Sequence, residues 1–112
     1  MPQFMLLLRD VSFPPPNATQ DEVMAIIERY RAWIQSASGA GNKLLDGEGR
    51  VLRRNGAGNV HVTDGPFAEA KEIVGGYFIV DVPSYEDAVA IARKGPHLEF
   101  GSIEIRAVDR TS

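Results

Sequence analysis

The chain has 112 residues, a formal net charge of −3, no cysteine and a hydrophobic share of 44%, which is ordinary for a globular domain. These values fit a single domain spanning residues 1–112, exclude disulfides and thiolate chemistry, and leave no overall positive charge to attract nucleic acid. The amino terminus lacks the pattern of a signal peptide, and its apolar run is too short to span a membrane. We therefore expect a soluble cytoplasmic protein that binds neither nucleic acid nor membrane.

The amino-terminal third of the chain predicts one strand and one helix. The apolar run Phe4–Leu8 is short and precedes a polar segment, which favours a buried strand over a helix. Thr19 with Glu22 three residues later forms a capping box, and apolar residues then recur at helical spacing. This pattern predicts a helix over residues 20–37.

The middle of the chain predicts a short strand and a β-hairpin. Gly39 and Gly41 mark the end of the first helix, and residues 43–45 predict a second strand. Residues 50–54 and 59–63 flank an Asn-Gly-Ala-Gly segment, which is typical of a hairpin with a glycine-rich loop.

The carboxyl-terminal third predicts a strand, a helix and a last strand. Residues 77–82 are almost all apolar, which favours a central strand. Ser84 caps a second helix over residues 84–94, and the alternation in residues 102–108 predicts the last strand. The apolar face expected for the second helix comprises Tyr85, Ala88, Val89 and Ala92.

The order of these elements is strand, helix, strand, hairpin, strand, helix, strand. Two helices divided among strands in this way predict an α+β fold, a ferredoxin-like βαββαβ sandwich with an extra β-hairpin. Both helices would lie on one face of the sheet. The other face would keep apolar residues that two short helices cannot cover, so we expect a symmetric homodimer.

Three blocks of this sequence resemble one known family. Residues 64–67, Asp-Gly-Pro-Phe, resemble the signature of the YCII-related (DGPF-domain) proteins, and residues 75–78, Gly-Gly-Tyr-Phe, resemble the strand that follows it in that family. Residues 95–106 are similar to the family's carboxyl-terminal block. The blocks occur in the family's order, and the resemblance covers essentially the whole chain.

The resemblance implies a dimeric α+β barrel built from two ferredoxin-like subunits. Most members of the family have no assigned reaction. A relative within the wider YCII group is a dechlorinating enzyme of chlorinated-hydroquinone breakdown, for which a His–Asp pair is invoked. The same barrel also hosts isomerases, monooxygenases and ligand binders, so the fold does not assign a function. Some members are encoded beside, or fused to, sigma factors, which implies a regulatory alternative.

His97 and Asp64 are the candidate catalytic residues. His97 follows the Gly-Pro that ends the second helix, and imidazole suits general acid–base chemistry near neutral pH. Asp64 precedes Gly-Pro in a turn that the geometry of the fold can bring near His97, where its carboxylate would orient the ring. The alternatives are structural: His97 bonds the backbone of a tight connection, and Asp64 stabilises its own turn.

Arg9, Phe67 and Tyr77 are the candidate substrate-binding residues. Arginine suits carboxylate or phenolate recognition, although a solvated ion pair is the alternative for Arg9. Phe67 and Tyr77 would form the wall of a pocket or part of the core. His61 with Asp64 and His97 matches no established ligand spacing, and no glycine-rich loop opens a helix. We therefore expect neither a metal nor a cofactor.

Three functions compete for this sequence. The first is a cofactor-independent enzyme, a general acid–base lyase, isomerase or dehalogenase, acting on a small molecule with His97 and Asp64. The second is a ligand-binding or regulatory module that uses the same cleft without turnover. The third is a purely structural dimerisation domain. An enzyme needs His97 at a cavity and in contact with another polar group, whereas a binder needs only the cavity.

Overall fold

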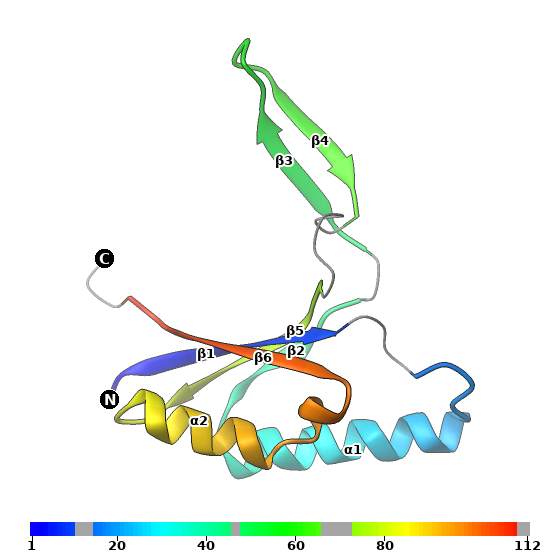
Figure 1. Cartoon of the computed structure of the whole chain (residues 1–112), viewed down its shortest axis with the longest axis vertical. Helices are drawn as coiled ribbons and strands as arrows, with labels where there is room; N and C mark the ends of the chain where they lie inside the picture. The colour runs from blue at the N-terminus through cyan, green and yellow to red at the C-terminus, as the bar shows by residue number, and fades with distance from the viewer. Residues whose placement is uncertain (11–14, 46–47, 66–72, 110–112) are drawn as a thin grey trace.

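The structure is a computed structural model, and it describes residues 1–10, 15–45, 48–65 and 73–109. One layer of helices covers one face of an antiparallel sheet, and a β-hairpin projects from the other side (Figure 1). In chain order the elements are β1 (Gln3–Asp10), α1 (Gln20–Ser36), β2 (Ala40–Lys43), β3 (Arg50–Arg54), β4 (Val60–Asp64), β5 (Ile73–Asp81), α2 (Tyr85–Lys94), the 3₁₀ helix η1 (Pro96–Glu99) and β6 (Gly101–Ala107).

The main sheet has the strand order β2-β5-β1-β6, with each neighbouring pair antiparallel. Without the β3–β4 hairpin, which forms its own two-stranded sheet, this is the ferredoxin-like arrangement. The predicted fold class is therefore confirmed. The second strand begins earlier than expected, at Ala40, and ends at Lys43.

Both helices begin where the capping signals predict. The Thr19 side chain accepts a hydrogen bond from the Glu22 N–H at 3.1 Å, which completes the capping box of α1. Ser84 caps α2 through the Asp87 N–H. The predicted face of α2 needs correction, because Tyr85 is 47% exposed. Ala88 and Ala92 are the buried residues of this helix.

The core lies between the helices and the sheet. Alternate residues of β1 and β5 face the helices, and the ring of Phe78 packs edge-on against Trp33 of α1 with centroids 4.8 Å apart. The Trp33 indole also donates a hydrogen bond to the Ile91 carbonyl at 2.8 Å, which joins α1 to α2. The buried hydrophobic residues are Phe4, Leu6, Leu8, Trp33, Phe78, Val80, Ala88 and Ala92.

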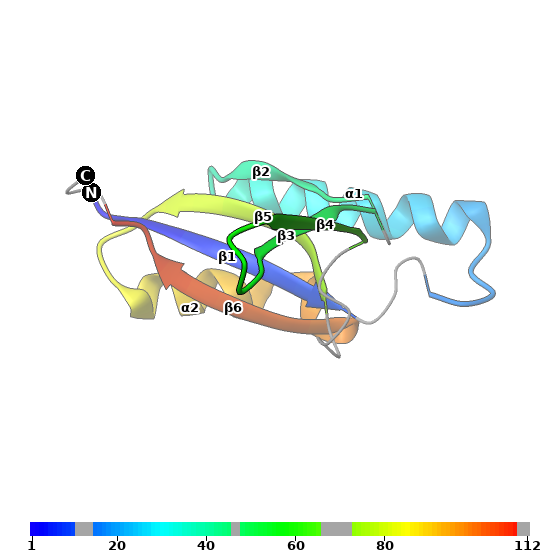
Figure 2. The ribbon, with the colours of Figure 1, turned by 90° about the horizontal axis from the view of Figure 1, so that it is seen from above.

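In the described part of the chain, no helix lies over the opposite sheet face (Figures 1 and 2). Because β1, β5 and β6 alternate, this face carries the residues between the buried ones. We call it the open face; its apolar residues include Met5, Leu7, Tyr77 and Ile79, and its charged residues include Arg9, Glu104 and Arg106.

Candidate functional site

A cavity of about 280 Å³ lies between α1 and the sheet. This volume is close to the lower end of small-molecule sites, which begin at roughly 300 Å³. The cavity combines an apolar wall with a few polar side chains, which is the usual composition of such sites. We call it the α1 cavity; its apolar wall includes Leu8, Ile27 and Ile34, and its polar side chains include Asp10, Tyr30 and His97.

His97 is held rigidly at this cavity by both of its ring nitrogens. It lies in η1, directly after the Gly95-Pro96 that ends α2, and it is 2% exposed. The Nε2 atom is 2.8 Å from the carbonyl oxygen of Arg9, and the Nδ1 atom is 2.8 Å from the hydroxyl of Tyr30. A carbonyl can only accept, so Nε2 carries a proton. In the neutral ring Nδ1 therefore accepts a hydrogen bond from Tyr30.

Tyr30 is the polar side chain that bonds His97 at the α1 cavity. Burial raises the pKa of its hydroxyl, and the negative charge of Asp10 raises it further. The hydroxyl therefore stays protonated over the range in which most proteins work. Because its hydrogen is directed to Nδ1, the hydroxyl oxygen acts as a hydrogen-bond acceptor toward other groups.

Asp10 is the third polar side chain at this cavity, and it is 6% exposed. It ends β1 on the face that also carries Leu6 and Leu8. The register between β1 and β5 shifts beside it, which places Gly75 against its carboxylate. A Cβ atom on Gly75 would lie 2.6 Å from Oδ2 of Asp10, so glycine is required for this close approach.

Two basic side chains, Arg31 and Lys43, also line the α1 cavity. Both residues are exposed. Arg31 forms an ion pair with Glu28, and Lys43 donates to the Leu44 carbonyl at 3.3 Å. Glu28 offsets the charge of Arg31, and the Asp10 carboxylate places a negative charge at the same cavity.

The structure does not bring Asp64 and His97 together within one chain. Asp64 ends β4 on the projecting hairpin, its side chain is 91% exposed, and it pairs with Arg50 at 3.3 Å. Both nitrogens of His97 are bonded to Tyr30 and to the Arg9 carbonyl instead. Gly65, directly after Asp64, has a φ of 86° in the left-handed region, and the rest of the predicted turn lies outside the described residues.

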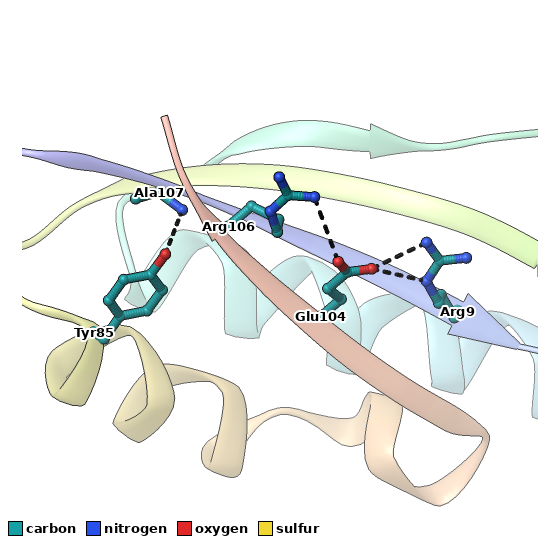
Figure 3. Close-up of polar contacts among 5 residues, drawn as sticks. All are labelled: Arg9, Tyr85, Glu104, Arg106 and Ala107. Atoms are coloured by element: carbon teal, nitrogen blue, oxygen red, sulfur yellow. Dashed lines mark hydrogen bonds and ion pairs between the residues drawn. The ribbon is translucent and has the colours of Figure 1, made fainter. Parts of the chain in front are cut away.

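The predicted substrate-binding residues have different positions. The Arg9 side chain lies on the open face, where it bonds Glu104 at 3.0 Å, and Glu104 also pairs with Arg106 (Figure 3). The Arg9 main chain contributes to the site through its carbonyl oxygen, which accepts a hydrogen bond from Nε2 of His97. Tyr77 borders the α1 cavity, although the pleat of β5 turns its side chain to the open face. Phe67 lies outside the described residues.

Sequence reasoning missed the roles of Asp10 and Tyr30. The sequence did contain a signal for Asp10, because it lies two residues after Leu8 and therefore on the same, buried face of β1. Tyr30 belonged to the predicted apolar stripe of α1, and only the fold shows that its hydroxyl meets a histidine 67 residues away. His61, the other histidine, is exposed and bonds Asn55 within the hairpin. Among the described residues, no three His, Asp or Glu side chains form a group that could hold a metal.

Comparisons with known proteins agree with the family resemblance of the sequence motifs. None of the helices in the described part of the chain is long and apolar enough to cross a membrane. The chain is 40% identical over 55 residues to an uncharacterized protein of Rhizobium meliloti (strain 1021), a match that spans 47% of this chain and 44% of the relative. The model of the YCII-related domain matches residues 14–112, and the chain therefore belongs to the YCII-related family.

Proposed function

We propose that this protein is a cofactor-independent acid–base enzyme for a small molecule, of the lyase, isomerase or dehalogenase type, with the α1 cavity as its substrate site. The observation that carries the proposal is the bond between Tyr30 and Nδ1 of His97 at this cavity. Buried polar groups that converge on an otherwise apolar cavity are typical of catalytic sites.

Tyr30 and His97 would act as a relay. A substrate hydroxyl or acidic C–H would give its proton to the Tyr30 oxygen while the Tyr30 proton passes to Nδ1 of His97. The resulting imidazolium would keep its Nε2–H bonded to the Arg9 carbonyl, with the carboxylate of Asp10 supplying negative charge nearby. This assigns Asp10 the electrostatic role that the sequence suggested for Asp64, and the pairing of His97 with Asp64 stays a prediction.

Deuterium exchange tests this proposal without a known substrate. Small keto acids and phenols are incubated with the protein in D₂O, and deuterium incorporation is followed by proton NMR. Tyr30→Phe should lower any catalysed exchange by roughly 10²–10⁴, the usual contribution of general acid–base catalysis. Tyr85→Phe is the matched control, because that hydroxyl accepts a bond from the Ala107 N–H outside the cavity (Figure 3). Equal exchange in both variants would refute the relay.

The alternative is a ligand-binding or regulatory module, and one observation favours it. Both nitrogens of His97 are already bonded within the chain, so the ring offers no nitrogen directly to a ligand. Binding of benzoate or hydroquinone, detected as NMR shifts at the α1 cavity without any catalysed exchange, would support this function. A link to sigma factors and a cytoplasmic location remain predictions under either function.

We also propose a homodimer that forms through the open face, as in a dimeric α+β barrel. The support is the set of apolar residues on the open face, which no helix covers in the described part of the chain. A stable interface of this kind should bury on the order of 1,200 Å² or more. Light scattering that gave a monomer at micromolar concentration would contradict it.

A further inference from the structure

The β3–β4 hairpin, with its loop at residues 55–59, projects from the sheet as an arm (Figure 1). Nine of its ten strand residues are exposed, and Val51 is the exception. An isolated two-stranded hairpin is at best marginally stable in water, because it has no second layer to bury its side chains. An arm with this shape therefore needs another surface to stabilise it.

One face of the arm carries an apolar patch, which we call the apolar face, between Arg50 and Asp64 at the base and Arg54 near the loop. Leu52 lies opposite Val62 in the register, and Val60 follows on the same face of β4. These side chains are 64%, 59% and 49% exposed. Three large apolar residues in adjacent positions on an exposed ribbon form a surface suited to contact with another protein.

Local contacts within the arm favour its hairpin conformation. The Asn55 side-chain oxygen accepts hydrogen bonds from the N–H groups of Ala57 and Asn59, each at 3.0 Å. Arg50 and Asp64 form an ion pair across its base. These contacts reduce the conformational entropy that the arm would lose on binding, although they do not bury its apolar face.

The charge of the arm is opposite to that of the rest of the chain. Residues 50–64 contain three arginines and one aspartate, a net charge of +2, whereas the whole chain carries −3. The other residues therefore carry −5. A basic arm and an acidic body are complementary when two copies of this chain meet.

The direction of the arm identifies where a second copy would lie. The arm rises on the open-face side of the sheet, away from both helices, and lies above the sheet when seen from that side (Figures 1 and 2). Stacked sheets pack roughly 10 Å apart, and a five-residue strand is about 17 Å long. An arm of this length reaches past the sheet of a second copy that sits on the open face.

We propose that the arm clasps a second copy of this chain, with Leu52, Val60 and Val62 packed against the partner's body. This inference rests on the homodimer proposed above and adds a second contact to it. In a symmetric dimer each copy contributes one arm, so the contact forms twice.

The test compares two double variants of the arm by analytical ultracentrifugation. Leu52→Ser with Val62→Ser removes the apolar face, and Val51→Ser with Thr63→Ser changes the cross-strand pair on the opposite face as the control. The first variant should raise the Kd of the dimer about a hundredfold, tenfold for each arm, or about 1.4 kcal/mol per arm. The control should leave the Kd within about threefold of the wild-type value.

A crosslinking experiment covers the case in which the serine variants disturb the hairpin itself. The chain has no cysteine, so Val62→Cys offers one site for a benzophenone maleimide. In a mixture of ¹⁴N and ¹⁵N chains, the label should crosslink to the body of the other copy. The same label on Met24→Cys, an exposed position of α1, should give no such crosslink.

The outcomes separate the arm from the dimer. Suppose that the wild-type chain dimerises, that the Leu52 and Val62 variant has the same Kd, and that position 62 gives no crosslink. This result overturns the proposed arm contact and leaves the open-face dimer intact. If the wild-type chain stays monomeric at about 100 μM, its Kd is too high for a stable dimer. That result overturns both the arm contact and the open-face dimer.

Discussion

Replacing Tyr30 by phenylalanine removes one hydroxyl and leaves the rest of the ring in place. The bond that disappears is the 2.8 Å contact to Nδ1 of His97, a side chain that is 2% exposed. Nδ1 would then be a buried acceptor without a donor from the protein. Because the ring packs edge-on against both His97 and Trp33, its apolar contacts should remain.

The loss of this donor should lower the free energy of unfolding at pH 7. A buried polar atom left without a partner costs about 1–3 kcal/mol. The α1 cavity borders both residues, so a water molecule can enter and replace part of the lost bond. We therefore expect a loss near the lower end, about 1 kcal/mol.

The same variant should change how stability depends on alkaline pH. Burial raises the pKa of Tyr30 above its unfolded value, which is near 10. Above about pH 10 the unfolded chain releases this proton while the folded chain retains it, so wild-type stability falls as pH rises. The slope should stay below about 1.4 kcal/mol per pH unit, because the half-exposed hydroxyl is partly screened by solvent. The phenylalanine variant should lack this component.

Urea unfolding of both proteins from pH 7 to pH 11 measures both effects. A double-mutant cycle with His97→Leu isolates the interaction energy between Tyr30 and His97, and we expect about 1 kcal/mol at pH 7. Equal stability of wild type and Tyr30→Phe at pH 7, with no coupling to His97, would refute the bonded pair. A constant difference between the two proteins up to pH 11 would refute the raised pKa.

Two further variants test the surroundings of the site. Gly75→Ala should lower the free energy of unfolding by about 1–3 kcal/mol, because the added Cβ would meet the Asp10 carboxylate, whereas Gly56→Ala, with open space around it, should cause no loss in the same urea assay. Asp64→Asn should change stability by less than about 0.5 kcal/mol, because Asp64 and Arg50 form an exposed ion pair; a larger loss would show that this carboxylate has another partner.

The sequence predicts most of the fold because its strongest signals are local. The capping residues Thr19 and Ser84 act on backbone groups within one turn, and both are found as predicted. Gly41 was read as a stop signal for α1, but it belongs to β2, where its missing side chain allows close approach to the Tyr77 main chain. The left-handed residue that follows α1 is Ser38, with a φ of 53°.

The site was harder to predict because its contacts join distant segments. The choice of His97 led to the α1 cavity, but the partners of its ring depend on how η1 packs against α1 and β1. A tyrosine at a helical apolar position predicts packing, and nothing in its spacing reveals a hydroxyl bond. Asp64 was chosen for its place before Gly65 and Pro66, but it lies at the base of the arm, paired with Arg50, rather than beside the α1 cavity.

Asp10 and Asp64 lie in different environments, one in the main sheet and the other on the arm. Asp10 is buried, and its carboxylate lies so close to Gly75 that a Cβ atom there would collide with it. Contacts within one chain therefore fix the position of Asp10. Asp64 is exposed on an arm whose apolar face is not covered by the described residues of the chain, so in the proposed dimer its surroundings would depend on assembly. The chemistry at the α1 cavity should therefore survive dilution of the protein, whereas any contribution from Asp64 should be lost with the dimer. Activity measured across the concentration range of dissociation would assign the working carboxylate to one of these residues.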